Sequence, residues 1–295
     1  MSSSILTNYG SMAALQSLEA TQNMLTNTEN QISSGLKVAS AKDDASSWTI
    51  ATTMKSNIAS LNQVSTDLGN ANSILNTAVA GAGQITSLVS QIRAKVASFT
   101  DTSQNQTAIQ GEVTQLVNQI GATIQSSSFN GVNLLDSSQP SGLTFVASTN
   151  NDYSGGGASP TISTGAATDL SSTSANAAAA AFYTLAGGLS AAITNANPAT
   201  QQTNLDTALK QIDAFNSTVE GQAAAFGAVQ QNVQSQQTFV NNLTTTLSTG
   251  VSNMVDADMT QESAKLSALQ TQQQLGTQAL SIANQAPQML LKLFG

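Results

Sequence analysis

The sequence of residues 54–96 is MKSNIASLNQVSTDLGNANSILNTAVAGAGQITSLVSQIRAKV, and it contains no proline. Alternate steps of four and three residues run through it without a slip, and they reach Met54, Ile58, Leu61, Ser65, Leu68, Asn72, Leu75, Val79, Ala82, Thr86, Val89, Arg93 and Val96. A 3.5-residue repeat is typical of a long helix that presents one narrow stripe to partner helices. At about 1.5 Å per residue the helix would be roughly 60 to 65 Å long. This stretch therefore predicts a helical rod, which an ordinary compact domain does not need.

A second rod is expected toward the other end of the chain, with a stripe of the same spacing from Ile212 to Met254. A third helix would bury Ile109, Val113, Leu116, Ile120 and Ile124. A second stripe on the first rod (Ile85, Leu88, Ile92, Lys95, Phe99) indicates that more than one helix packs there. The predicted core of this bundle consists of Ile58, Leu61, Leu68, Leu75, Val79, Val89, Ile212, Phe215, Val219, Phe226, Val229, Val233, Val240, Leu243 and Leu247.

The two ends of the chain are predicted to form weaker helices. The first runs to about residue 36, and its stripe contains two polar residues, Gln22 and Glu29, which weaken it as a free-standing coiled coil. The last begins at Asp258, which with Gln261 has the form of an N-cap and its capping-box partner, and its spacing continues up to Pro287. Such helices are marginal alone and should order against a partner. Their apolar seams, which we expect to serve in self-assembly, are Leu15, Leu18, Leu25, Ile32, Leu36, Leu266, Leu269 and Leu280.

The middle of the chain is irregular. Asn130-Gly131 is a strong turn signal, and residues 143–146 are the best strand candidate. Residues 148–176 predict a loop with a short β-hairpin, followed by a short helix in the alanine run from Ala177. The chain would thus run out and back. We predict a mainly α fold, a long antiparallel α-helical coiled-coil bundle that pairs the N- and C-terminal halves, with a small β-hairpin region in the middle.

Composition narrows the function. Of 295 residues only 8% are charged, the net charge is −8, and no cluster of Lys or Arg exists, which argues against nucleic-acid binding. A long surface of amide and hydroxyl groups with few charges suits self-association, although a merely soluble, weakly charged domain is the alternative. The N-terminus lacks a secretory signal, and no apolar window is long enough to insert into a membrane.

No catalytic, cofactor-binding or metal site is predicted. The chain has no His and no Cys, which excludes Ser-His-Asp and Cys-His catalysis and metal sites built on those ligands. The acidic pairs Asp43-Asp44 and Asp256/Asp258 lie at predicted helix starts, where carboxylates cap free N–H groups. The glycines at 155–157 lack the strand-to-helix context of a phosphate loop. We therefore do not expect an enzyme.

Four motifs, in order, resemble those of the bacterial flagellin family. They are Ser33-Ser34-Gly35-Leu36-Lys37 with Ser40-Ala41-Lys42-Asp43-Asp44-Ala45, then Phe129-Asn130-Gly131-Val132, then Val255-Asp256-Ala257-Asp258, and finally Ala283-Asn284-Gln285-Ala286-Pro287-Gln288. The resemblance covers roughly residues 1–147 and 200–295. It implies a subunit that polymerises into the extracellular filament for swimming motility.

The resemblance also implies an organisation and partners. Residues 1–45 and 256–295 would form a terminal coiled coil, the inner tube of the filament, which is disordered in the free subunit. Residues 46–200 and 201–255 would form the helical-bundle domain, with 148–198 as a short, variable, surface-exposed segment and no large outer domain. The implied partners are other copies, the hook-junction and cap proteins, and an export chaperone on the C-terminal region, with secretion through the flagellar type III export apparatus.

One segment departs from the family pattern. Residues 91–96 align with the segment that an innate immune receptor reads in many flagellins, and Arg93 and Glu112 match the contact positions. However, Lys95 stands in place of a leucine and Ala94 in place of an acidic residue. An ammonium in place of a buried leucine should cost the receptor interface more than about 1 kcal/mol. We expect weak or absent receptor activation.

Three rivals remain beside the filament subunit. The first is a flagellin-like surface adhesin that binds polysaccharide, for which only Tyr153, Phe182 and Tyr183 are available near the middle. The second is a minor assembly protein such as a junction or cap component, against which the match at both ends argues. The third is a metal-dependent hydrolase, which would need carboxylate clusters that the sequence lacks.

Overall fold

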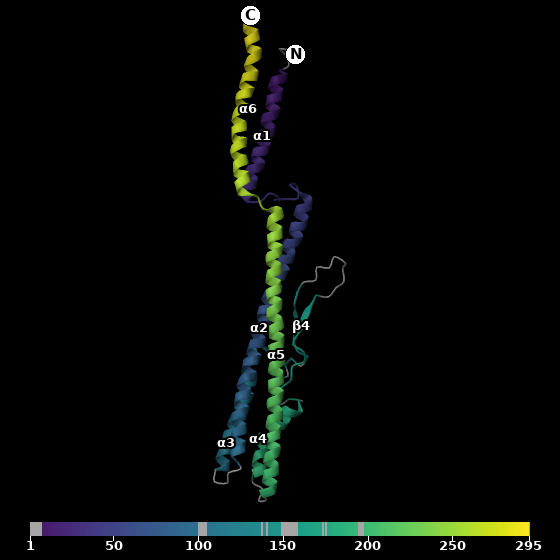
Figure 1. Ribbon diagram of the computed structural model, residues 1–295, viewed down its shortest axis with the longest axis vertical. Coiled ribbons are helices and arrows are strands. Elements are labelled where there is room, and N and C mark those ends of the chain that lie inside the picture. The colour runs from purple at the N-terminus through teal and green to yellow at the C-terminus, as the bar shows by residue number, and fades with distance from the viewer. Residues whose placement is uncertain are drawn as a thin grey trace. The chain divides into compact units, whose positions relative to one another are not determined.

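The computed structural model describes residues 8–99, 105–136, 138–139, 141–148, 159–172, 174, 176–193 and 198–294. Its helices are α1 Tyr9–Ser34, α2 Ala45–Ser98, α3 Gln106–Ser126, α4 Ala177–Ile193, α5 Pro198–Val255 and α6 Met259–Phe294 (Figure 1). Its strands are β1 Ser128–Phe129, β2 Val132–Asn133, β3 Thr144–Val146 and β4 Thr161–Ser163. The predicted fold class, a mainly α antiparallel bundle with small hairpins, is confirmed. Among the described residues no helix is long and apolar enough to cross a membrane.

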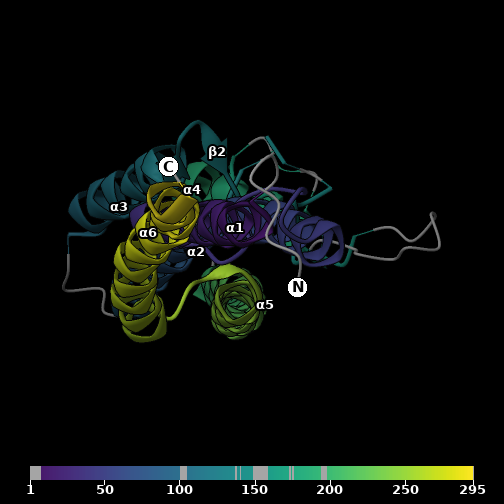
Figure 2. The ribbon, with the colours of Figure 1, turned by 90° about the horizontal axis from the view of Figure 1, so that it is seen from above.

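The chain divides into two compact units. Unit 1 comprises Met1–Ile58 and Thr245–Gly295, and unit 2 comprises Ala59–Thr244. Helices α1 and α6 lie side by side in unit 1 (Figures 1 and 2). They are antiparallel, because Ser11 bonds Asn284 whereas Gln22, further along α1, bonds Gln273.

A second cluster in unit 1 lies where α2 begins and α5 ends. Its buried residues are Val38, Ala51, Val251 and Val255, against which Leu36, Met54, Ile58 and Met254 pack. Leu36 therefore packs in this cluster and not in the seam of α1, which ends at Ser34. Ile58, predicted in the core of the long bundle, also belongs here. The reason is the turn at Gly35: its φ of 71° ends α1, and Leu36 then pairs as an antiparallel bridge with Asp256.

Acidic side chains near this cluster accept hydrogen bonds from backbone N–H groups. Asp44 accepts hydrogen bonds from the N–H groups of Ser46 and Ser47 and so caps α2, and Asp258 caps α6 through the N–H of Thr260. Asp43 was expected at a helix start, but its carboxylate closes the preceding turn instead.

Helices α2 and α5 lie antiparallel in unit 2. Side-chain hydrogen bonds join the two helices, and the residue numbers on α5 fall as those on α2 rise. The bonded pairs are Ser65 with Asn241, Asn72 and Asn76 with Gln230, and Arg93 with Asp213. On α5 the expected stripe lies inward, and Ile212, Phe215, Val219, Phe226, Val233 and Val240 are buried. Val229, Leu243 and Leu247 are half-buried.

On α2 every second residue of the stripe that begins at Met54 is buried from Leu61 onward, and the residues between them are not. Leu61, Leu68, Leu75 and Val89 are buried, as are Ala82 and Val96. Between them the buried residues are Val64, Ala71, Ala78, Ile85 and Ile92, each one residue before its predicted counterpart. Val79, predicted in the core, is half-buried for this reason, and Arg93 is exposed. The buried side chains at these positions are Val, Ala or Ile, whereas the predicted counterparts are mostly polar.

The turn after α3 is a tight hairpin. Asn130 and Gly131 have φ values of 50° and 79°, as a two-residue turn between paired strands requires, and Phe129 pairs with Val132. Asn133 fastens the hairpin to α3 by donating to the carbonyl of Ile124. On α3 itself Val117 is buried and Leu116 only half-buried, so one of the five expected core positions is displaced.

The middle segment is not uniformly exposed, in contrast to the expectation for residues 148–198. Leu170 and Phe182 are fully buried, and the ring of Phe182 stacks on Phe215 of α5 with centroids 4.2 Å apart. Strand β4 pairs with β3, so the expected hairpin is present. Tyr153 and the glycines at 155–157 lie outside the described residues.

Gly81 of α2 allows α2 to touch the hairpin after α3. A methyl group there would overlap the Ser127 hydroxyl and lie 2.9 Å from Leu135 Cδ1, whereas one at Gly83 would meet nothing. Overpacking should make Gly81→Ala less stable by about 1 to 3 kcal/mol. Gly83→Ala is the matched control and should be more stable by up to about 1 kcal/mol through helix propensity. Urea unfolding followed by circular dichroism measures both, and equal effects would contradict this packing.

The loop before α2 should respond to acid. The N–H of Ser40, followed by its hydroxyl, lowers the pKa of Asp43, and the hydroxyl and N–H of Ser47 lower the pKa of Asp44. Lowered pKa values mean that the stabilisation is present above the unfolded value of about 3.9 and is lost as pH falls through the folded values. Asp43→Asn and Asp44→Asn should therefore flatten the fall of Tm between about pH 5 and 2. Glu19→Gln on α1 removes one negative charge in the same way and is the control. If Tm falls with pH in the Asp43→Asn and Asp44→Asn variants as it does in the Glu19→Gln variant, the assignment is refuted.

Candidate assembly surfaces

The inner faces of α1 and α6 cover each other. On α1 the stripe that faces inward is Ser11, Ala14, Leu18, Thr21, Leu25, Thr28 and Ile32. On α6 it is Glu262, Leu266, Leu269, Gln273, Gly276, Leu280 and Ala283. Gly276 makes room for a side chain of α1, since a methyl group there would lie 3.2 Å from Leu18 Cδ1. The pair is a knob-and-hole seam; on α1 larger apolar residues alternate with Thr, whereas on α6 Leu266 and Leu269 are followed by Gln273 and Gly276.

The predicted seam residues fall into two groups. Leu18, Leu25, Ile32, Leu266, Leu269 and Leu280 all lie on the seam, with Leu25 and Leu269 buried. Leu15 lies outside it and is 46% exposed. The seam of α1 uses Ala14, Thr21 and Thr28 where the larger Leu15, Gln22 and Glu29 were expected.

The seam is held by few strong contacts. The Thr28 side chain is fully buried, and its hydroxyl has no hydrogen-bond partner. A buried hydroxyl without a partner costs stability. Gln273 donates across the seam to the Gln22 side chain, which adds specificity more than stability. The seam therefore contains groups that lower its stability as well as apolar ones that raise it.

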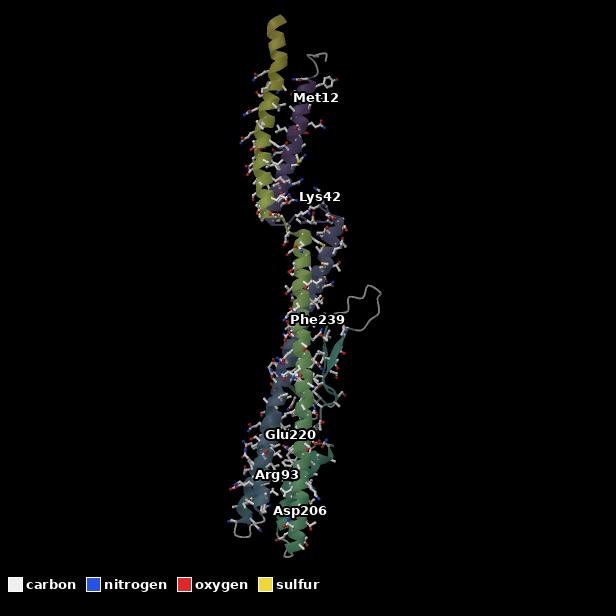
Figure 3. The ribbon with its side chains drawn as sticks, viewed as in Figure 1. Met12, Lys42, Arg93, Asp206, Glu220 and Phe239 are labelled. Carbon is white, nitrogen blue, oxygen red and sulfur yellow. The ribbon has the colours of Figure 1, made fainter. Side chains whose placement is uncertain are left out.

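The outer faces of α1 and α6 carry large apolar side chains that the described chain does not cover. On α1 these are Tyr9, Met12, Leu15 and Met24, with Tyr9 72% exposed (Met12 is labelled in Figure 3). On α6, Leu275 and Ile282 are 59% and 69% exposed, one heptad apart. They continue a second, outward stripe of Ala264, Ala268, Leu275, Ala279 and Ile282. Rows of exposed apolar side chains on a helix indicate an interaction surface.

Charge scarcely opposes contact with another copy through these helices. Over α1 the charged residues are Glu19 and Glu29, and over α6 they are Glu262, Lys265 and Lys292. Glu262 and Lys265 pair with each other at 3.3 Å. The outer faces can thus be covered by further chains with little desolvation of charge.

In unit 2 the segment expected to face an immune receptor is engaged in two exposed ion pairs. Arg93 Nε (Arg93 is labelled in Figure 3) donates to Asp213 of α5 at 2.8 Å, and this bond raises the pKa of Arg93. Lys95 Nζ lies 2.5 Å from Glu112 of α3. Lys95 and Glu112 also line a groove of about 630 Å³ between α2 and α3 with Leu116. Exposed pairs of this kind contribute little to stability, but they occupy the side chains.

Within the residues that the structure describes, no group of three or more Asp, Glu, His or Cys side chains could hold a metal ion. A polar cavity of about 930 Å³ in unit 1 is lined by Lys37, Lys42, Asp43 and Asp44, but both carboxylates already accept backbone hydrogen bonds. Tyr183, an expected sugar contact, has its hydroxyl buried, and burial raises its pKa to about 12.

Comparison with known proteins matches both ends of the chain to family models. The bacterial flagellin N-terminal helical region matches residues 5–140, and the bacterial flagellin C-terminal helical region matches residues 203–294. Relatives cover nearly the whole chain. Flagellin FljK of Caulobacter vibrioides is 37% identical over 99% of this chain and 98% of its own. The flagellin of Brucella melitensis and flagellin C of Rhizobium meliloti are each 34% identical over 99% of both chains.

These matches agree with the paired terminal helices, the long antiparallel bundle and the uncovered apolar faces. Flagellins are structural proteins and not enzymes, and they polymerise into the extracellular filament that drives motility. The chain belongs to the bacterial flagellin family and is a structural subunit of the flagellar filament.

Proposed function

We propose that the subunits join through the outer faces of α1 and α6, with residues 1–45 and 256–295 forming the inner tube of the filament. The observation that carries this proposal is the second stripe of α6, which includes Leu275 and Ile282 and has no partner in the described chain. Burial of these two side chains would contribute about 1.5 to 3 kcal/mol each. The inner seam, which contains Leu18, Leu25, Ile32, Leu266, Leu269 and Leu280, holds the two helices together within one subunit.

The terminal helices fold when the subunit assembles. Their seam is interrupted by polar residues and contains the unpaired Thr28 hydroxyl, which supports a pair that is marginal in the free subunit. A chain without disulfides and with marginal ends is suited to passage through the type III export apparatus in an unfolded state. Before assembly, an export chaperone covers the C-terminal region, where the outward apolar stripe of α6 would otherwise be exposed.

The same terminal surfaces serve the two ends of the filament. Hook-junction proteins meet the first subunits and the cap meets the last, and both must cover the outer faces that a neighbouring flagellin covers elsewhere. The bundle of unit 2, with its core around Leu61, Leu68, Phe215 and Phe226, keeps its shape during these exchanges.

An adhesin is less well supported. Of the three aromatic residues that could hold a sugar, Phe182 is fully buried and Tyr183 packs edge-on against Phe215. Aromatic rings must be exposed to stack on a sugar.

Receptor activation is weak in this proposal. Arg93 is held by Asp213 and Lys95 by Glu112, so a receptor would have to break both pairs and desolvate an ammonium where other flagellins offer a leucine.

Seeded polymerisation tests the assembly surface. Purified monomer, given short filament fragments, should grow uniform filaments by electron microscopy with a gain in helix by circular dichroism. Leu275→Gln/Ile282→Gln should raise the critical monomer concentration at least about tenfold. Leu275→Met/Ile282→Val keeps the surface apolar and should assemble normally. The proposal fails if the wild type does not assemble, or if the two double variants behave alike.

A reporter-cell assay with purified monomer tests the receptor segment. The wild type should activate weakly or not at all, and Lys95→Leu should increase potency at least about fivefold because it restores an apolar contact. Lys95→Arg retains the charge and should stay inactive. Full activation by the wild type would refute the proposal.

A further inference from the structure

A proline lies within α6 and leaves one carbonyl without its usual donor. Helix α6 continues through Pro287 to Phe294, past the point where the sequence suggested that the regular spacing stops. In an α-helix each N–H donates to the carbonyl four residues earlier, and proline has no N–H. The carbonyl of Ala283 therefore lacks the donor that every other residue type at position 287 would supply. A partly buried carbonyl in this situation needs another partner.

Asn8, at the start of α1, supplies that partner. Its side-chain Nδ2 donates to the carbonyl oxygen of Ala283 at 2.8 Å. Its Oδ1 meanwhile accepts from the N–H of Ser11 at 3.1 Å and caps α1. Asp and Ser cap helices as well as Asn does, but a carboxylate cannot donate and a serine side chain is shorter. The amide thus performs two tasks at once.

We infer that Asn8 and Pro287 are a matched pair that fixes the register of α1 against α6. The apolar residues of the 3–4 repeat recur in successive turns, so register depends on single specific contacts such as the bond from Gln273 to Gln22, and the Asn8–Ala283 bond is a further one. Pro287 is the one proline of α6, so within the helix interior only the carbonyl of Ala283 loses its backbone donor to a proline. If α1 slipped by a turn, Asn8 would face a carbonyl that its own helix already bonds. Asn8 is a positioning residue, and the pair selects one alignment of the terminal helices.

A double-mutant cycle in assembled filaments tests this inference, which rests on the proposed assembly of the terminal helices. Asn8→Asp preserves the cap but removes the donor. In the Pro287 chain it should slow seeded elongation about five- to tenfold, the loss of one hydrogen bond to a carbonyl left without a partner. Pro287→Ala restores the N–H at position 287, so in that background Asn8→Asp should change elongation less than about twofold.

Ser11→Ala is the matched control. It removes the neighbouring bond from Ser11 to the Asn284 side chain, which is 2.7 Å long and does not depend on the backbone of residue 287. Ser11→Ala should slow seeded elongation by the same factor with Pro287 and with Pro287→Ala. If Asn8→Asp also slows elongation by the same factor in these two backgrounds, the inference of a matched pair is overturned. Failure of the unmodified chain to form filaments would instead count against the assembly surface.

A cysteine reporter keeps the inference testable if Pro287→Ala impairs assembly by itself. The chain has no cysteine, so an introduced pair reports one contact only. Ser11→Cys/Asn284→Cys should cross-link in filaments of the native register, and Asn8→Asp should lower the yield. Ser11→Cys/Leu280→Cys, displaced by about one turn, should gain in yield. An unchanged pattern of cross-links would refute the role of Asn8.

Discussion

A helix with one narrow apolar stripe must have that stripe covered along its length, and this requirement shapes both units of the chain. Helices α2 and α5 have 54 and 58 residues, and helices in proteins owe most of their stability to the packing of one apolar face rather than to helix propensity. Within unit 2 they cover each other in an antiparallel arrangement, which lets the chain return by way of α3, two hairpins and α4. The buried stripe of α2 includes Ala71 and Ala78 between larger residues, and hydrogen bonds such as that from Gln230 to Asn76 join α5 to α2.

In unit 1, α1 and α6 also cover each other's inner stripes, but these stripes contain fewer large apolar residues. The seam contains Thr21, Thr28 and Gln273, so it gains specificity at the expense of stability. A protein that had to be stable as a monomer would fill these positions with Leu and Ile. In the proposed assembly the remaining stability comes from neighbours, because the uncovered stripe of α6 is buried only when another chain binds. Weakly stable terminal helices and a surface with few charges thus both favour burial by neighbouring copies.

Periodicity predicted the existence of every long helix and the inward stripes of α5 and α6, because on those helices the largest apolar residues face inward. On α1 and in the first half of α2 it predicted only alternate positions. There the intervening seam residues are small, such as Ala14, Thr21 and Ala71, and the regular 3–4 count reached the neighbouring residue even where that residue is polar, as at Gln22 and Asn72. In the second half of α2 the expected second stripe is buried at Ile85, Leu88 and Ile92, and just after the helix at Phe99. Leu36 and Ile58 were displaced because the turn at Gly35 redirects the chain. The ion pair from Arg93 to Asp213 joins residues 120 positions apart, and no local pattern could reveal it.

The difference between the two outer faces bears on how copies arrange themselves. A two-fold dimer pairs the same patch on both partners, so it favours one self-complementary face. Here α1 presents Tyr9 and Met12, whereas α6 presents Leu275 and Ile282 on a background of alanine. Large side chains on one helix fit best against the small residues of the other, so the favoured contact joins unlike faces of successive copies. Such a contact leaves an unused face at each end of the assembly and, unless its rotation closes a ring, continues as an open helical polymer. The asymmetry of the terminal pair thus favours a filament over a closed dimer, and a fixed register between α1 and α6 presents both faces at the same height in every copy.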